Sequence, residues 1–159
     1  MQRQRHSRTM SGYRRILWPT DFSVAARAAL PHVRLMAELT GGEVVLLHVL
    51  PTPVMYANPD VAPALVRLDP EIRATAAREL ERLAKLLRTQ GVKVKSLVED
   101  GLPVERILRV ARRLRCDLIL LATHGRSGLA HVLLGSVAEN VVRRAPCPVL
   151  VVRSKGSRR

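Results

Sequence analysis

Two glycines in the last third of the chain have a spacing that suits the binding of a phosphate group. Gly125 and Gly135 are separated by nine residues, and Ser136 follows the second glycine directly. An apolar run at 117–121 precedes this segment, and a helical pattern follows it. A strand, a glycine-bearing loop and the start of a helix let backbone N–H groups converge on an anion. The segment therefore predicts a nucleotide-binding loop.

The start of the following helix supplies further hydrogen-bond donors for an anion. Ser136 and Glu139 form an S-x-x-E pattern, which predicts that Ser136 caps the helix in a capping box. The N–H groups of Ser136, Val137 and Ala138, with the positive end of the helix dipole, favour an anion by roughly 0.3–1 kcal/mol. We expect the Ser136 hydroxyl to bind the same phosphate, which is compatible with the capping role.

Three further polar side chains are candidates for the same site. Arg126 lies inside the glycine loop, where it is either a phosphate contact or a solvated charge. His124 is interpreted as a side chain that orders the loop rather than as a catalytic base. Asp21 follows the first apolar run and is either a turn residue or an acceptor for a base or ribose. His48, inside an apolar run, is interpreted as a core histidine.

The elements that must position these residues follow from periodicity. Continuous or alternating apolar runs predict strands at 15–19, 43–50, 92–99, 117–122 and 147–152, and helical spacing predicts helices at 23–39, 71–88, 103–115 and 136–144. This βαβαβαβαβ order predicts an α/β fold, an open doubly wound five-stranded parallel sheet with helices on both faces. Ligands of such sheets bind at the carboxyl ends of the strands, where the winding direction reverses.

Composition limits the class of protein. The chain has 159 residues, of which 47% are hydrophobic and only 3% aromatic, so one domain with an aliphatic core is expected at 13–153. A disordered basic tail is expected at 1–12 and a second basic tail at 154–159. No apolar stretch is long enough to cross a bilayer and no signal peptide precedes the domain, so we expect a cytoplasmic protein without membrane contact.

The net charge of +14 raises the alternative of weak nucleic-acid binding through the basic tails. We favour solvated tails, because no aromatic residues interleave with the charges for base stacking.

Several chemistries lack their sequence signatures. Cys116 and Cys147 form no metal-binding spacing and are expected to be small core residues in a reducing compartment. The chain has no G-x-x-x-x-G-K-[ST] motif, no G-x-G-x-x-G after the first strand, and no assignable catalytic triad or carboxylate pair. We therefore expect a binding protein without evident catalytic machinery, capable at most of slow hydrolysis of its nucleotide.

Three segments together resemble the universal stress protein family. They are ILWPTDFS at 16–23, LLHV at 46–49 and the long block at 122–152. The resemblance implies a strand order of 3-2-1-4-5. One branch of that family binds ATP through a glycine-x2-glycine-x9-glycine-Ser/Thr motif, which here has Ala122 in place of the first glycine, followed by Gly125, Gly135 and Ser136. We expect an extended strand end to tolerate the extra methyl group, at some cost in affinity.

The resemblance also implies the ligand and the partner. The ligand would be ATP or another adenine nucleotide, with Mg²⁺ carried by its phosphates. Its adenine and ribose would contact Pro19, Thr20, Asp21 and Val49. Its phosphates would lie among Ala122, His124, Gly125, Gly135, Ser136 and Val137. A homodimer would pair through Val149–Val152. A dimeric interaction protein of this fold that binds no nucleotide remains the alternative to this stress-response or signalling module.

Overall fold

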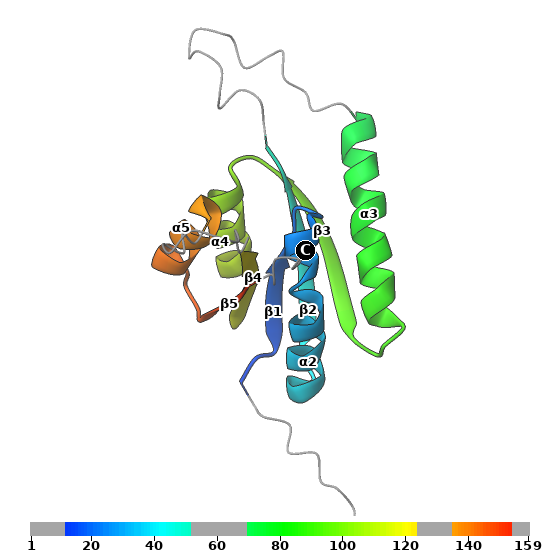
Figure 1. Ribbon diagram of the computed structural model, residues 1–159, viewed down its shortest axis with the longest axis vertical. Coiled ribbons are helices and arrows are strands. Elements are labelled where there is room, and N and C mark those ends of the chain that lie inside the picture. Colours follow the sequence, from blue (N-terminus) through cyan, green and yellow to red (C-terminus); the bar gives the residue numbers. More distant parts are fainter. Residues whose placement is uncertain (1–11, 52–69, 124–134, 154–159) are drawn as a thin grey trace, which may run out of the picture.

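Five parallel strands form one sheet in the order β3-β2-β1-β4-β5. The computed structural model describes residues 12–51, 70–123 and 135–153. The strands are β1 (Arg15–Pro19), β2 (Glu43–Leu50), β3 (Lys93–Asp100), β4 (Leu118–Thr123) and β5 (Val149–Arg153) (Figure 1). The helices are α1 (Val24–Arg27), α2 (Leu30–Thr40), α3 (Pro70–Arg88), α4 (Pro103–Arg113) and α5 (Ser136–Arg144). The predicted fold class and strand order are confirmed.

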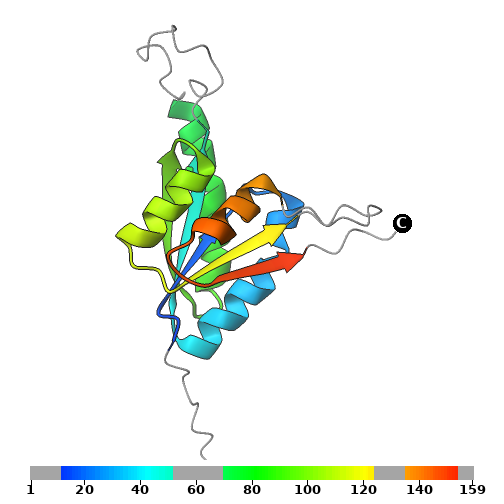
Figure 2. The same ribbon diagram turned by 90° about the vertical axis from the view of Figure 1, so that its left-hand side faces the viewer.

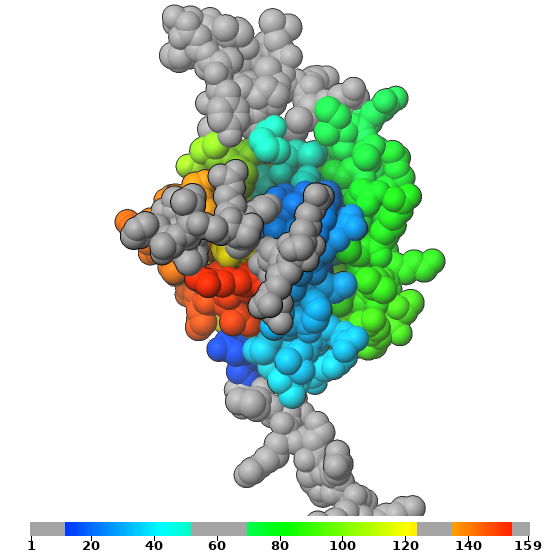
Figure 3. Space-filling view, in the orientation of Figure 1, coloured from blue at the N-terminus to red at the C-terminus, as the bar shows by residue number. Residues whose placement is uncertain are grey.

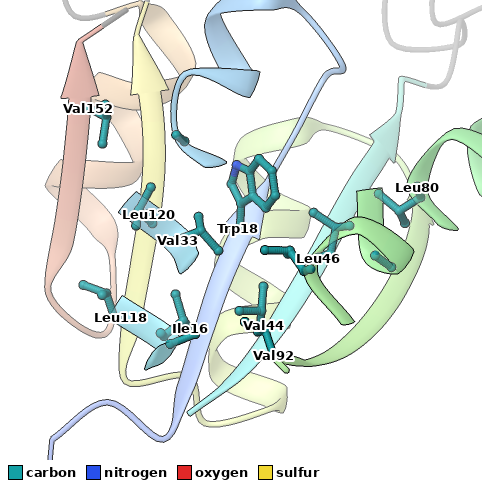
Figure 4. Packing of buried hydrophobic residues seen from close by; sticks show 14 residues of the cluster. Ile16, Trp18, Val33, Val44, Leu46, Leu80, Val92, Leu118, Leu120 and Val152 are labelled. Carbon is teal, nitrogen blue, oxygen red and sulfur yellow. The ribbon is translucent and has the colours of Figure 1, made fainter. Parts of the chain in front are cut away.

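Both faces of the sheet are buried, which explains why its central strands are continuous apolar runs. Successive side chains of a strand point to opposite faces. Ile16 and Trp18 of β1 therefore pack with α2 and α3, whereas Leu17 packs with α4 and α5. Figure 4 shows the first of these layers, with residues of β1, β2 and β4 on one side of the sheet together with Val33 of α2. Figure 2 shows α4 and α5 lying side by side over the other face.

The register places the carboxyl ends of β1, β2 and β4 at one edge of the sheet. Trp18 pairs with Leu46 of β2, and Ile16 pairs with Leu118 of β4. The chain after β1 winds toward β2 and β3, whereas β4 and β5 lie on the other side of β1. The winding therefore reverses between β1 and β4, which is where a ligand cleft is expected in this class of fold.

The helix expected at 23–39 is wrong in one respect, because it is two helices. α1 ends at Arg27 and α2 begins at Leu30, with i→i+3 hydrogen bonds from Ala28 to Ala25 and from Ala29 to Ala26 between them. Pro31 explains the break, since its ring has no N–H and would collide with the carbonyl of the residue four positions earlier. Ser23 is the N-cap of α1, and its hydroxyl accepts the Ala26 N–H at 3.0 Å.

Other element boundaries differ from expectation by a few residues. β3 extends to Asp100, α4 ends at Arg113 and β5 begins at Val149 rather than at Cys147. β3 lies at the sheet edge and is half exposed, as its alternating pattern predicts. Nearly all of the two predicted basic tails lies outside the described residues. None of the helices within the described ranges has the length and apolar character that a membrane span requires.

Candidate functional site

A cavity of about 410 Å³ opens at the carboxyl edge of the sheet, at the switch point between β1 and β4. Cavities of this size are typical of small-molecule sites. Its described walls come from β1, β2, β4 and the turn after β1, and from the first turns of α4 and α5. Eight of the residues predicted from the sequence line it, namely Pro19, Thr20, Asp21, Val49, Ala122, Gly135, Ser136 and Val137. The predicted residues His124, Gly125 and Arg126 lie outside the described residues.

The turn after β1 is held by its own short polar side chains. The Thr20 N–H donates to the Leu47 carbonyl at 2.8 Å, which continues the pairing of β1 with β2. The Thr20 hydroxyl accepts the Phe22 N–H at 3.1 Å, and Asp21 Oδ1 accepts the Ser23 N–H at 3.0 Å. Phe22 has a φ of 62°, a left-handed conformation that is uncommon outside glycine. These bonds fix a sharp turn before any ligand binds.

His48 was expected in the core, but it is half-buried and lines the cavity, so that interpretation is wrong. Its Nδ1 lies 2.8 Å from the Thr20 carbonyl oxygen, and its ring stacks on Phe22 with a centroid distance of 4.3 Å. A carbonyl oxygen can only accept, so Nδ1 carries the hydrogen. His48 therefore connects the end of β2 to the turn that carries Asp21. Its polar side chain within an apolar strand end was the available signal.

The N-terminus of α5 opens into the cavity beside β4. Its N-cap is Gly135, in an extended conformation, and no side chain among the described residues caps the helix. The predicted capping box is therefore wrong, because the helix starts one residue earlier than that pattern requires, with Gly135 instead of Ser136 as N-cap, and Glu139 pairs with Arg143 at 2.9 Å. The first recorded helical bond runs from the Glu139 N–H to the Gly135 carbonyl at 3.0 Å. The N–H groups of Ser136, Val137 and Ala138 precede it and have no intrahelical acceptor.

The opposite wall of the cavity is apolar. This wall is formed by Leu47, Leu121 and Ile107. Pro103, the first residue of α4, lies at its margin. Ala122 lies inside β4 in extended backbone and pairs with Val152, so its methyl group is accommodated as expected. The contribution of α4 was missed at the sequence level. It follows only from the topology, which brings the N-terminus of α4 to the same edge as that of α5.

Charged side chains are sparse in the described part of the cavity wall. Asp21 is the one carboxylate among these lining residues, and no lysine or arginine is among them. In the described ranges, no group of three or more His, Cys, Asp or Glu side chains is arranged to hold a metal ion. Cys116 and Cys147 lie elsewhere, as free thiols packed against the α4 side of the sheet. Burial raises the pKa of Cys116 to about 11 and also raises the pKa of Cys147.

The fold and the site together define an open doubly wound α/β protein with a cleft at its switch point that is apolar on one side and rich in N–H donors on the other. The sequence profile of the universal stress protein family matches residues 12–153. Universal stress protein MJ0577 of Methanocaldococcus jannaschii is 36% identical over 158 residues, which cover 91% of this chain and 98% of that protein. Universal stress protein MJ0531 of the same organism is 34% identical, with 89% and 82% covered. The chain therefore belongs to the universal stress protein family.

Solved structures agree with this assignment. The structure of MJ0577 superposes with a TM-score of 0.75 at 37% identity, over 91% of this chain and 99% of that one. The universal stress protein UspA from Lactobacillus plantarum gives a TM-score of 0.70 at 27% identity, over 89% and 99%. Two more distant structures are complexes, one with cAMP at 23% identity and one from Archaeoglobus fulgidus with dAMP at 21%, both with TM-scores of 0.64. At these identities the likeness shows the fold.

Proposed function

We propose that this protein is a stress-response or signalling module that binds ATP in the cavity at the switch point. One observation carries the proposal: the uncapped N-terminus of α5 and an apolar wall face the same cavity of about 410 Å³. N–H groups at a helix N-terminus favour phosphate, and apolar walls favour a purine ring. An adenine nucleotide has both parts in one molecule.

The nucleotide is oriented by the two ends of the cavity. The adenine and ribose lie against Pro19, Thr20 and Val49, with Asp21 near the ribose. The phosphates lie at the other end, and the residues proposed to surround them are Ala122, His124, Gly125, Arg126, Gly135, Ser136 and Val137. Since the described wall offers few carboxylates, Mg²⁺ enters with the phosphates and keeps mostly water and phosphate oxygens as ligands.

The relatives support an adenine nucleotide as the ligand. Two proteins of this fold have been solved with cAMP and with dAMP, both of which contain adenine and a phosphate. Neither has a triphosphate, so the preference for ATP over shorter nucleotides rests on the number of N–H donors at α5. The free thiols of Cys116 and Cys147 fit a reducing compartment, and we place the protein in the cytoplasm.

We also propose that two copies pair through the free edge of β5. β5 is the last strand of the sheet, and Figure 3 shows it at the molecular surface. Leu150 is 37% exposed on this strand. An uncovered apolar edge strand invites pairing with another strand, which a second copy of β5 can supply.

Calorimetric titration of the full-length chain tests the nucleotide proposal. Mg²⁺-ATP is compared with ADP, AMP, cAMP, GTP and inorganic triphosphate. We expect ATP to bind more tightly than AMP and GTP, because phosphates and adenine both contribute. Absence of binding by every adenine nucleotide, together with a stable dimer in sedimentation, would instead support an interaction protein that uses the fold without a nucleotide.

A further inference from the structure

A second hollow lies between α4 and α5, and its polar lining is almost entirely arginine. We call it the arginine groove; it has a volume of about 410 Å³ and is lined by Glu105, Leu108, Arg109, Arg112, Arg113 and Arg144. Three arginines come from α4 and one from the last turn of α5. Four arginines, from two helices that are separate in sequence, therefore line one small hollow with a single carboxylate among its lining residues.

Within the part of the chain that the structure describes, three of these four arginines form no ion pair. Arg113 donates to Glu99 at 2.6 Å. Within the described ranges, Arg109, Arg112 and Arg144 have no recorded hydrogen bond or ion pair. By contrast, several exposed arginines elsewhere on the helices are paired, such as Arg34 with Glu38 and Arg73 with Asp100. The arginine groove thus concentrates uncompensated positive charge.

Helix geometry explains how the protein tolerates this concentration. Arg112 and Arg113 lie in the last turn of α4, and Arg144 lies in the last turn of α5. Positive side chains at a helix C-terminus are stabilised by the negative end of the helix dipole. That stabilisation acts within each helix, so it does not account for the convergence of the two helix ends on one hollow. An anion bound in this hollow could contact arginines of both helices at once.

The lining specifies the chemistry of the ligand. Guanidinium groups donate hydrogen bonds and accept none, and their planar fork suits phosphate oxygens. A phosphate chain is almost purely an acceptor, whereas a peptide also brings N–H donors, for which this lining offers only Glu105. No aromatic residue is among the lining residues, which disfavours stacked single-stranded bases. A stiff duplex would contact the rim of a hollow, while a flexible single chain can enter it.

We propose that the arginine groove binds linear inorganic polyphosphate. The site is separate from the proposed nucleotide cavity, because the two hollows share no lining residue. The proposal therefore does not depend on nucleotide binding and can fail without affecting it. Each phosphate that contacts a guanidinium group releases bound counterions. The affinity of the protein for polyphosphate should therefore fall as the salt concentration rises.

The test measures fluorescence anisotropy of end-labelled linear polyphosphate of one chain length with the full-length protein. The double variant Arg112→Gln/Arg144→Gln removes one unpaired charge from each helix. The matched control Arg78→Gln/Arg82→Gln removes the same formal charge from exposed positions on α3, across the sheet, and leaves both basic tails intact. Thermal unfolding checks that both variants are folded.

We expect the groove variant to weaken binding about tenfold or more, and the control to weaken it less than about threefold. The slope of log affinity against log salt should fall by about 1 to 1.5 in the groove variant, since each lost phosphate contact contributes about 0.7. Arg112→Lys keeps the positive charge but loses the planar guanidinium, so its affinity for polyphosphate should fall a few-fold. This variant tests the proposal if the double variant proves unstable.

Several results would overturn the proposal. Equal loss in the groove variant and the control would assign the binding to net charge or to the tails. If the wild-type protein does not bind polyphosphate at physiological salt, polyphosphate is excluded as the ligand. Tighter groove-dependent binding of duplex DNA or of an acidic peptide, measured by competition, would assign the groove to a different partner.

Discussion

Gly135 offers a sharp test of the proposed phosphate site, because a methyl group there affects the ligand and not the protein. Gly135 has a φ of −51° and a ψ of 148°, which any residue can adopt. A methyl group at this position would meet no atom of the described residues within 4 Å. Gly135→Ala therefore introduces a methyl group into the open cavity mouth, at the point where the backbone should approach the phosphates.

The effect on folding is small because two contributions oppose each other. Alanine is a poorer N-cap than glycine, but it lowers the entropy of the unfolded chain by the equivalent of about 0.4–1 kcal/mol. We expect the free energy of unfolding to change by less than about 1 kcal/mol. A hydrogen bond to a charged group contributes about 1.5–3 kcal/mol, so displacing the phosphates from one N–H should weaken ATP binding roughly 10- to 150-fold.

Calorimetric titration with Mg²⁺-ATP measures the affinity, and urea unfolding measures the stability. Gly12→Ala is the matched control, since its methyl group would likewise meet no atom of the described residues within 4 Å and Gly12 is not among the residues that line the cavity. Gly135→Ser sharpens the test: serine is a better N-cap than alanine, so the variant should be at least as stable as the wild type while still binding ATP more weakly. Unchanged ATP affinity in both Gly135 variants would refute the close approach of the phosphates to this backbone.

Three further predictions address the rest of the structure. His48→Phe keeps the stacking on Phe22 but leaves the Thr20 carbonyl without its partner, so it should cost about 0.5–1.5 kcal/mol in urea unfolding and weaken ATP binding; an unaltered protein would contradict the role of this bond. Burial raises the pKa of Cys116 from 9.0 to about 11, so the thiol ionises at lower pH in the unfolded chain than in the folded protein. The free energy of unfolding should therefore fall between those two pH values, by on the order of 2–3 kcal/mol. Cys116→Ala should remove that part of the decline, and a variant with the same pH profile as the wild type would contradict the burial of this thiol. Leu150→Lys should shift sedimentation from dimer to monomer at micromolar concentration, and a dimer of undiminished strength would exclude pairing through this edge of β5.

The fold could be predicted from the sequence because its signals are local and repeated. Strands such as Glu43–Leu50 are buried on both faces and therefore appear as unbroken apolar runs. Glycine marks the end of a helix, as at Gly41, which follows α2 and adopts the left-handed conformation with a φ of 65°. The break between α1 and α2 was missed because an apolar stripe continues across it, although Pro31 was a visible signal.

The site could be predicted only in part, because tertiary packing decides much of it. Thr20, which follows β1, and Ser136, which begins α5, could be placed at one edge once the sheet was known to be parallel. The exposure of His48 depends on the sharp turn at Phe22, which no local pattern specifies. The arginine groove depends on how α4 and α5 pack together, so no sequence window contains both of its sides.

Amide chemical shifts of the full-length protein provide the most direct test of the central claim, that the N-terminus of α5 holds the phosphates of an adenine nucleotide. ¹⁵N–¹H spectra are recorded during titration with Mg²⁺-ATP and, separately, with adenosine. The account predicts large saturable shifts of the Ser136, Val137 and Ala138 amides with ATP, and much smaller shifts of these amides with adenosine. ATP binding that leaves these three amides unmoved would contradict it.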